Sequence, residues 1–182
     1  ASDVYKRQIS MGLRFGTFSI TLTLIPIVVG SALYGWGSGA WLGFVFGVTV
    51  LLTGDANLFL AVNIPGTIIT VILKGTLAGA AAGFVYKLIS KKNQIAAVIV
   101  SAVVAPVVNT GIFVLGSYVF FFDYLSGLAE GTNLFVFILV GLVGVNFFIE
   151  LGINLVLNPA ILQIIRIGKK NFGGKNQIIK TK

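Results

Sequence analysis

Long apolar runs separated by short polar turns make up most of this chain. Five runs are candidate membrane helices: Phe18–Trp36, Gly39–Leu52, Ile64–Tyr86, Ile95–Phe122 and Leu134–Ile165. A bilayer core takes about 20 helical residues, so the second run is short, and the last two allow tilt or kinks at Pro106 and Pro159. Strands of a membrane barrel would alternate apolar and polar residues, and these runs do not. The pattern predicts an all-α integral membrane protein.

Composition supports this prediction and narrows the chemistry. The 182 residues are 57% hydrophobic and 10% charged, against roughly 25% charged in a soluble domain. The chain has no cysteine and no histidine, which removes disulfides, thiolate metal sites and the usual general base near neutral pH. Carboxylates do not cluster either, so we expect no enzyme activity, catalytic residue, metal or cofactor.

The positions of the charges predict the topology. Lys87, Lys91 and Lys92 lie between the third and fourth runs, and most other basic residues follow the last run. Basic residues collect in cytoplasmic loops, so the C-terminus is predicted to be cytoplasmic. The acidic turn with Asp123 and Glu130 is then outside. This placement explains the net charge of +8 through topology and contact with anionic lipid headgroups, rather than through nucleic acid.

The same count leaves Lys6, Arg7 and Arg14 outside, where basic residues are rare. A sixth span before them would bring both ends inside. We therefore predict a six-helix bundle whose first helix is largely missing, with about five complete spans and Ile9–Leu13 as a remnant. Residues 1–10 are predicted to be extraneous or truncated, 11–168 to form one transmembrane domain, and 169–182 to be a basic cytoplasmic tail.

Lys74 is the most informative residue, because it stands alone in the apolar run Thr67–Tyr86. A lysine near the centre of a membrane helix costs about 2.5–3.5 kcal/mol on insertion scales. It should therefore face protein or water and have a partner. The candidates are an anionic ligand, an ion pair with Glu150, or another group; a depth difference of roughly 14 Å from helix rise makes the ion pair awkward.

Other polar residues are predicted to share a substrate-binding cavity with Lys74, open to the outside. Asn109 and Asn146 have estimated depths similar to that of Lys74. Asn63, Thr67 and Thr70 are placed near the mouth and Asp55 and Asn57 in the loop above. The apolar walls are predicted to be Phe59, Phe113, Tyr118 and Trp36. The candidate substrate-binding set is Lys74, Asn109, Asn146, Asn63, Thr67, Thr70, Asp55 and Asn57. The alternative is that the Asn and Thr side chains only join helices by hydrogen bonds.

Glycine recurs every four residues in two stripes. These are Gly39, Gly43 and Gly47 in the second run, and Gly75, Gly79 and Gly83 in the third. Four-residue spacing places each stripe on one helix face, where another backbone can approach closely. The stripes serve either packing within the bundle or docking of a partner membrane protein.

Several short motifs in this order resemble one transporter family. They are Ser19–Gly30 leading into Ala32–Gly35, then Gly43–Gly47, the Gly54-Asp55 loop, Leu73-Lys74-Gly75, Pro106–Thr110 and Asn146–Glu150. Together they resemble the substrate-binding S components of energy-coupling factor (ECF) vitamin transporters, over about residues 15–168. The closest similarity is to the branch that includes pantothenate-specific S components.

The resemblance implies a six-helix bundle in a bacterial plasma membrane that binds a vitamin from outside. The implied partners are a transmembrane coupling subunit (T component) and two ATPase subunits, against which the S component topples to release the vitamin inside. The family's first helix docks the coupling subunit, and this chain departs from the family there.

The predicted function is vitamin capture, with pantothenate as the first candidate because its carboxylate suits Lys74. Hydroxymethylpyrimidine, thiamine-related compounds and folate are alternative ligands. A self-sufficient small transporter, a membrane enzyme and a structural subunit are the competing classes. A self-sufficient transporter predicts an internal repeat or a polar stripe across the whole membrane, and we find no convincing repeat. A structural subunit would give Lys74 no role beyond ion pairing.

Overall fold

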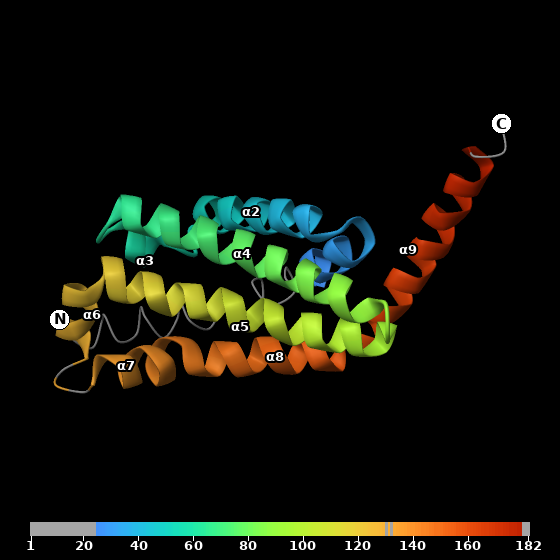
Figure 1. Ribbon diagram of the computed structural model, residues 1–182. Helices are drawn as coiled ribbons and strands as arrows, with labels where there is room; N and C mark the ends of the chain where they lie inside the picture. The colour runs from blue at the N-terminus through green and yellow to red at the C-terminus, as the bar shows by residue number, and fades with distance from the viewer. Residues whose placement is uncertain (1–24, 130, 132, 180–182) are drawn as a thin grey trace.

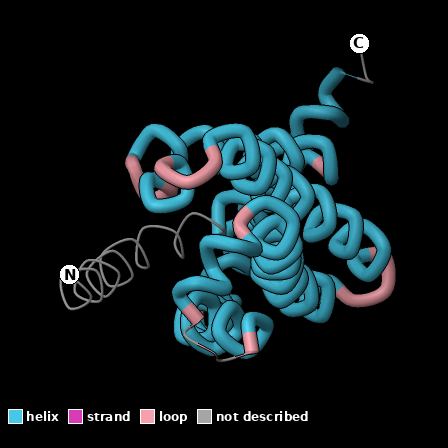
Figure 2. The backbone as a smooth tube through the Cα atoms, turned by 90° about the vertical axis from the view of Figure 1, so that its left-hand side faces the viewer, coloured by secondary structure: helices cyan, strands magenta, loops and turns pink. Residues whose placement is uncertain are grey.

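The computed structural model describes residues 25–129, 131 and 133–179, and every regular element in this part is a helix (Figure 2). The elements are the helix Ile25–Tyr34, α2 (Trp36–Thr53), α3 (Asn57–Leu60), α4 (Ile64–Ser90), α5 (Gln94–Phe120), α6 (Phe122–Leu128), α7 (Leu134–Val136), η1 (Phe137–Gly144), α8 (Val145–Val156) and α9 (Asn158–Ile179). The predictions for the N-terminal segment, including a truncated first helix, lie outside the described residues.

Four helical segments are long and apolar enough to cross a membrane: α2, α4, α5, and the continuous segment Leu134–Val156 made of α7, η1 and α8. The helix Ile25–Tyr34 is apolar but shorter. This confirms the all-α membrane fold. The second predicted run forms a longer helix than expected, because α2 begins at Trp36, directly after Gly35 turns the chain with φ of 95°.

The spans form successive layers, with α4 between α2 and α5 (Figure 1). The segment with α8 also packs against α5. Two asparagines cap the first turns of α4 and α5. The Asn63 side chain accepts a hydrogen bond from the backbone N–H of Gly66 at the start of α4, and Asn93 caps α5 in the same way.

The last predicted span is wrong in its length. The helix ends at Val156, and α9 begins at Asn158 as a separate element that leaves the bundle at an angle (Figure 1). Pro159 explains the break, because proline lacks the backbone N–H that would continue the preceding ladder of hydrogen bonds. The first part of α9 still belongs to the core, where Ile161 and Ile165 are buried. In contrast, α5 continues through Pro106.

Part of the Leu134–Val156 segment is π-helical, from Phe137 to Gly144. A π-helix has an i→i+5 pattern, which the sequence did not reveal. At Gly144 an added Cβ would lie 2.8 Å from the carbonyl oxygen of Leu139, so this position leaves no space for a side chain.

The two glycine stripes face each other across the contact between α2 and α4. A Cβ added at Gly43 would overlap the carbonyl of Gly75, and Gly39 and Gly79 are related in the same way. Gly47 packs against the backbone of Val71. The backbones therefore touch directly, as small residues permit in membrane helices.

This packing decides between the two functions considered for the stripes. All six glycines are buried: Gly39, Gly43, Gly47, Gly75, Gly79 and Gly83. The docking alternative is not supported, because the neighbouring helix of the same chain already occupies the faces that a partner would need. Gly83 contributes by packing against the backbone of Trp36.

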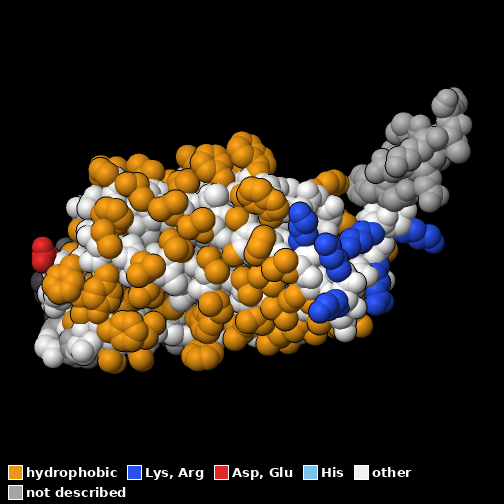
Figure 3. Space-filling view, in the orientation of Figure 1, with side chains coloured by type: hydrophobic (Ala, Val, Ile, Leu, Met, Phe, Trp, Pro, Cys, Tyr) orange, Lys and Arg blue, Asp and Glu red, His pale blue; other side chains and the backbone are white. Residues whose placement is uncertain are grey.

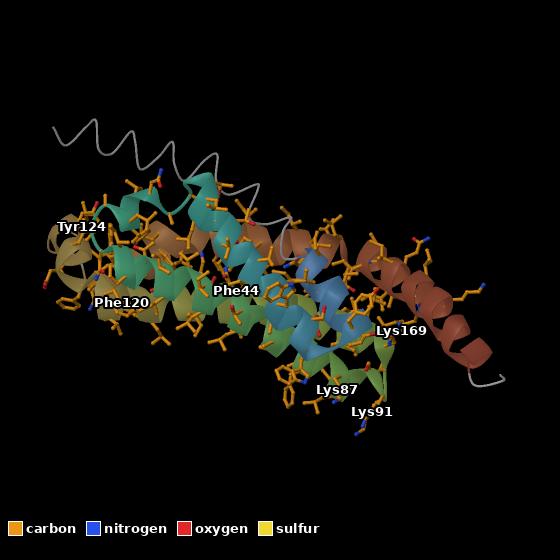
Figure 4. The ribbon with its side chains drawn as sticks, turned by 90° about the horizontal axis from the view of Figure 1, so that it is seen from above. Phe44, Lys87, Lys91, Phe120, Tyr124 and Lys169 are labelled. Atoms are coloured by element: carbon orange, nitrogen blue, oxygen red, sulfur yellow. The ribbon has the colours of Figure 1, made fainter. Side chains whose placement is uncertain are left out.

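Basic and acidic side chains on the surface lie at opposite ends of the bundle (Figure 3). Lys87, Lys91 and Lys169 mark one end, and Phe120 and Tyr124 mark the other (Figure 4). Lys169 also lies over the ring of the buried Tyr86, with its Nζ 5.0 Å from the ring centroid. We call these the basic end and the aromatic end.

Candidate functional site

Two charged side chains interrupt the apolar interior of the described spans, Lys74 on α4 and Glu150 on α8. The other charges of these helices lie near their ends. Ionisable residues inside a membrane are uncommon and serve function by default. These two residues are therefore the centre of the candidate site.

Lys74 lies in the half of α4 nearer the aromatic end, about ten residues or roughly 15 Å from the helix start. Its Nζ is 5.4 Å from the centroid of the Phe113 ring on α5, a distance at which a cation is attracted to an aromatic face. The side chain is partly buried. Among the described residues it makes no hydrogen bond or ion pair, so its charge is compensated only in part.

Phe113 is one of three aromatic rings that pack on one another. Phe113 packs edge-on against Phe59, with ring centroids 5.5 Å apart, and Phe59 packs in the same manner on Phe121 at 5.0 Å. Phe59 comes from the short helix α3, so the segment between α2 and α4 contributes to the site. Phe59 and Phe113 were predicted as apolar walls, whereas Phe121 was not, and only its burial reveals it.

The register of α4 against α5 places Asn109 close to Lys74 along the bundle axis. Gly66 lies against Phe120, and Thr70 lies against Gly116, so the two antiparallel helices run in step. Extending this register brings Lys74 level with Ile112. Asn109 then lies about one turn closer to the basic end, and on the face of Phe113 by its i,i+4 spacing.

Asn109 and Thr70 are candidates for hydrogen bonding to a ligand. Both are buried, and Asn109 Oδ1 and Thr70 Oγ1 have no hydrogen-bond partner among the described residues. A buried polar atom without a partner costs about 1–3 kcal/mol. Ser101 and Ser117 on α5 are buried in the same state. The sequence carried a signal for Ser101, which precedes Asn109 by eight residues and so shares its helix face.

Glu150 is 5% exposed and faces the bundle interior. Among the described residues it forms no ion pair, with Lys74 or with any other cation. The structure therefore does not show the direct ion pair considered from the sequence. One turn further on, the Asn154 side chain donates a hydrogen bond of 3.3 Å to the carbonyl of Ala102, which joins α8 to α5.

Two of the predicted site residues have structural roles. Asn63 uses its side-chain oxygen for the cap of α4, and its Nδ2 donates to the carbonyl of Phe120 at 3.3 Å. Thr67 donates its hydroxyl to the Asn63 carbonyl at 2.7 Å. The bond of Asn63 to Phe120 holds the start of α4 to the end of α5. Together the bonds of Asn63 and Thr67 occupy the polar atoms that a ligand would have used.

The remaining predicted residues lie apart from Lys74 or outside the description. Asp55 and Asn57 are exposed near the aromatic end, where the Thr53 hydroxyl donates to Asp55 at 2.9 Å. The backbone of Asn146 lies in α8, but its side chain is outside the described part of the structure.

The described residues contain no group of three metal-ligating side chains. What they offer is one cation, a ring face and several hydrogen-bonding atoms without partners. Such a set can bind and orient a small polar molecule, and it contains no pairing of a nucleophile with a base.

Comparison with known families agrees with this chemistry. A family model described as "ECF transporter, substrate-specific component" matches residues 8–162. Neither the curated proteins nor the solved structures gave a significant match.

Proposed function

Because the chain belongs to the family of ECF transporter substrate-specific components, we propose that it captures a carboxylate-bearing vitamin or vitamin precursor, with pantothenate as the best candidate. Membership makes the chain a substrate-binding, multi-pass membrane subunit of a transporter rather than an enzyme. Its proposed partners are a T component and two ATPase subunits, against which it delivers the ligand by toppling.

One observation carries the choice of an anionic ligand. Lys74 is held in the membrane interior beside Phe113 and has no carboxylate in contact with it among the described residues. A ring face compensates an ammonium only partly, by about 0.5–2 kcal/mol. A ligand carboxylate would supply the missing charge, whereas a neutral or cationic ligand would leave Lys74 uncompensated.

The distribution of charge supports entry from outside. The basic end carries exposed Lys87 in the last turn of α4, and exposed Lys91 and Lys92 in the turn between α4 and α5. Basic side chains gather at this end of the molecule (Figure 3). If this end is cytoplasmic, by the positive-inside rule, Lys74 lies in the outer half of the membrane. The C-terminus, which follows α9 at the same end, is then cytoplasmic as well.

Pantothenate fits the groups near Lys74 better than the alternatives do. It carries one carboxylate, one amide and two hydroxyls, which suit an ammonium and hydrogen-bonding groups such as Asn109. Thiamine is cationic and hydroxymethylpyrimidine has no carboxylate, so neither uses Lys74. Folate carries carboxylates but is much larger.

The direct test is to identify small molecules that co-purify with the protein by mass spectrometry, and then to titrate pantothenate. Replacing Lys74 by Met or Gln should weaken binding at least about 30-fold, because removing one partner of a buried charge pair costs about 2 kcal/mol or more. Lys87→Met is the matched control, because Lys87 is exposed at the basic end, and it should bind as the parent does. Equal affinity of the Lys74 variants would exclude Lys74 from the site.

A further inference from the structure

The contacts of α5 with its two neighbours give the relative depth of Lys74 and Glu150. Thr70 on α4 lies against Gly116 on α5, which brings Lys74 level with Ile112. Asn154 on α8 donates to the Ala102 carbonyl of α5, which brings Glu150 level with Pro106. The two charges are therefore offset by about six residues, or roughly 9 Å along the bundle axis.

Asn109 lies between these two levels. It follows Ala102 by seven residues and precedes Phe113 by four, which places it on the helix face defined by those two contacts. Phe113 contacts Lys74 and Ala102 contacts α8, so this face runs from one charge to the other. We call Lys74, Asn109 and Glu150 the polar strip.

The strip changes its hydrogen-bonding character along its length. Lys74 offers only donors, Glu150 offers only acceptors when ionised, and Asn109 has an acceptor oxygen without a partner. Asn109 and Glu150 are each 5% exposed. Buried acceptors without donors are unfavourable. The Glu150 end of the strip therefore requires hydrogen-bond donors, and the Lys74 end requires an anion.

Neighbouring elements do not supply the donor that Glu150 requires. The described residues of α5 and η1 include no charged side chain, and the cations of α9 with described side chains, Arg166, Lys169 and Lys170, are exposed at the basic end. Lys74, the cation at the other end of the strip, forms no ion pair with Glu150. A bound molecule can satisfy both groups at once.

We infer that the ligand lies along the bundle axis, with its carboxylate at Lys74, a polar group at Asn109, and hydroxyl or other hydrogen-bond donors at Glu150. This rests on the proposed role of Lys74. An offset of roughly 9 Å is the reach of between two and three residues of extended chain, so the substrate class is a short acyclic monoacid with donors at its far end. Pantothenate has this order of carboxylate, amide and hydroxyls. A dicarboxylate is excluded, because Glu150 repels a second negative end.

The test compares two ligands on matched variants of the full chain in lipid nanodiscs. One ligand is pantothenate and the other is its analogue without either hydroxyl, N-(3,3-dimethylbutanoyl)-β-alanine. Removing the hydroxyls should weaken binding to the parent protein at least about 10-fold, because buried acceptors then lose their donors. In Glu150→Leu the two ligands should bind with nearly equal affinity. Glu150→Gln keeps the size and an acceptor oxygen. Its ratio of affinities for the two ligands should lie between those of the parent and Glu150→Leu, and it serves as the control for misfolding of the Leu variant.

The control is Asp123→Asn, which removes one exposed carboxylate of α6 and should leave the ratio as in the parent. A purely structural role of Glu150 would weaken both ligands equally and keep the ratio, which would overturn the inference while Lys74 still binds the carboxylate. Absence of pantothenate binding to the parent protein would overturn the proposed ligand, and the inference with it.

Discussion

At the scale of single residues, the intramembrane polar groups fall into two classes. Asn63 and Asn154 make hydrogen bonds that join neighbouring helices, and Thr67 makes one within the start of α4. Lys74 and Asn109 have no hydrogen-bond partner among the described residues. Residue type does not separate the classes, because asparagine occurs in both. Only the position of the neighbouring backbone does so.

Asn63 provides a test of this division. Asn63→Ala removes the cap of α4 and the bond to Phe120, so the protein should lose about 1 kcal/mol of stability, or roughly 2–4 °C in Tm. The affinity for the ligand should change little, since both polar atoms of the side chain bind backbone. Thermal unfolding and ligand titration of the same sample measure the two quantities. A large loss of affinity with unchanged Tm would show that Asn63 contacts the ligand and would contradict its purely structural role.

At the scale of elements, α4 presents two different faces. Gly75 and Gly79 bring it into backbone contact with α2, whereas Thr70 and Lys74 lie toward α5. A close glycine contact fixes the distance and register of α2 and α4, because carbonyl groups leave no space for a side chain. This rigid pair then holds Lys74 at a defined depth opposite Phe113.

Gly43→Ala should therefore destabilise the protein by about 1–3 kcal/mol, because its Cβ would overlap the Gly75 carbonyl. Alanine has the higher helix propensity by about 1 kcal/mol, so the sign of the effect is informative. Gly111→Ala on α5 is the matched control, since an added Cβ meets nothing within 4 Å there. It should leave stability unchanged or increase it. Unfolding in a denaturing detergent measures both, and equal stability of the two variants would disprove the close packing of α2 and α4.

At the scale of the whole molecule, the two ends differ in charge. The basic end combines the turn between α4 and α5 with α9 (Figures 3 and 4). The aromatic end carries Asp55, in the turn before α3, and Asp123, in α6. This difference is what orients a membrane protein. It also decides from which side a ligand reaches Lys74.

The absence of cysteine in the chain permits a direct test of orientation. In intact cells, a membrane-impermeant maleimide should label Asp123→Cys at once and should label Lys91→Cys only after the membrane is permeabilised. Both positions are exposed, so differences in burial do not confuse the comparison. The reverse pattern of labelling would place the basic end outside and would contradict capture from the outer face.

The sequence by itself determined the membrane class, most of the spans, the charged ends and the exceptional position of Lys74. These features depend on the free energy of transferring each segment into a bilayer, which is a local property of composition. Tertiary structure decided that the glycine stripes face each other, that Asn63 is a cap, that Phe113 lies beside Lys74, and that Lys74 and Glu150 remain apart. Those features depend on the rotation and register of packed helices, which arise from contacts between segments distant in the chain.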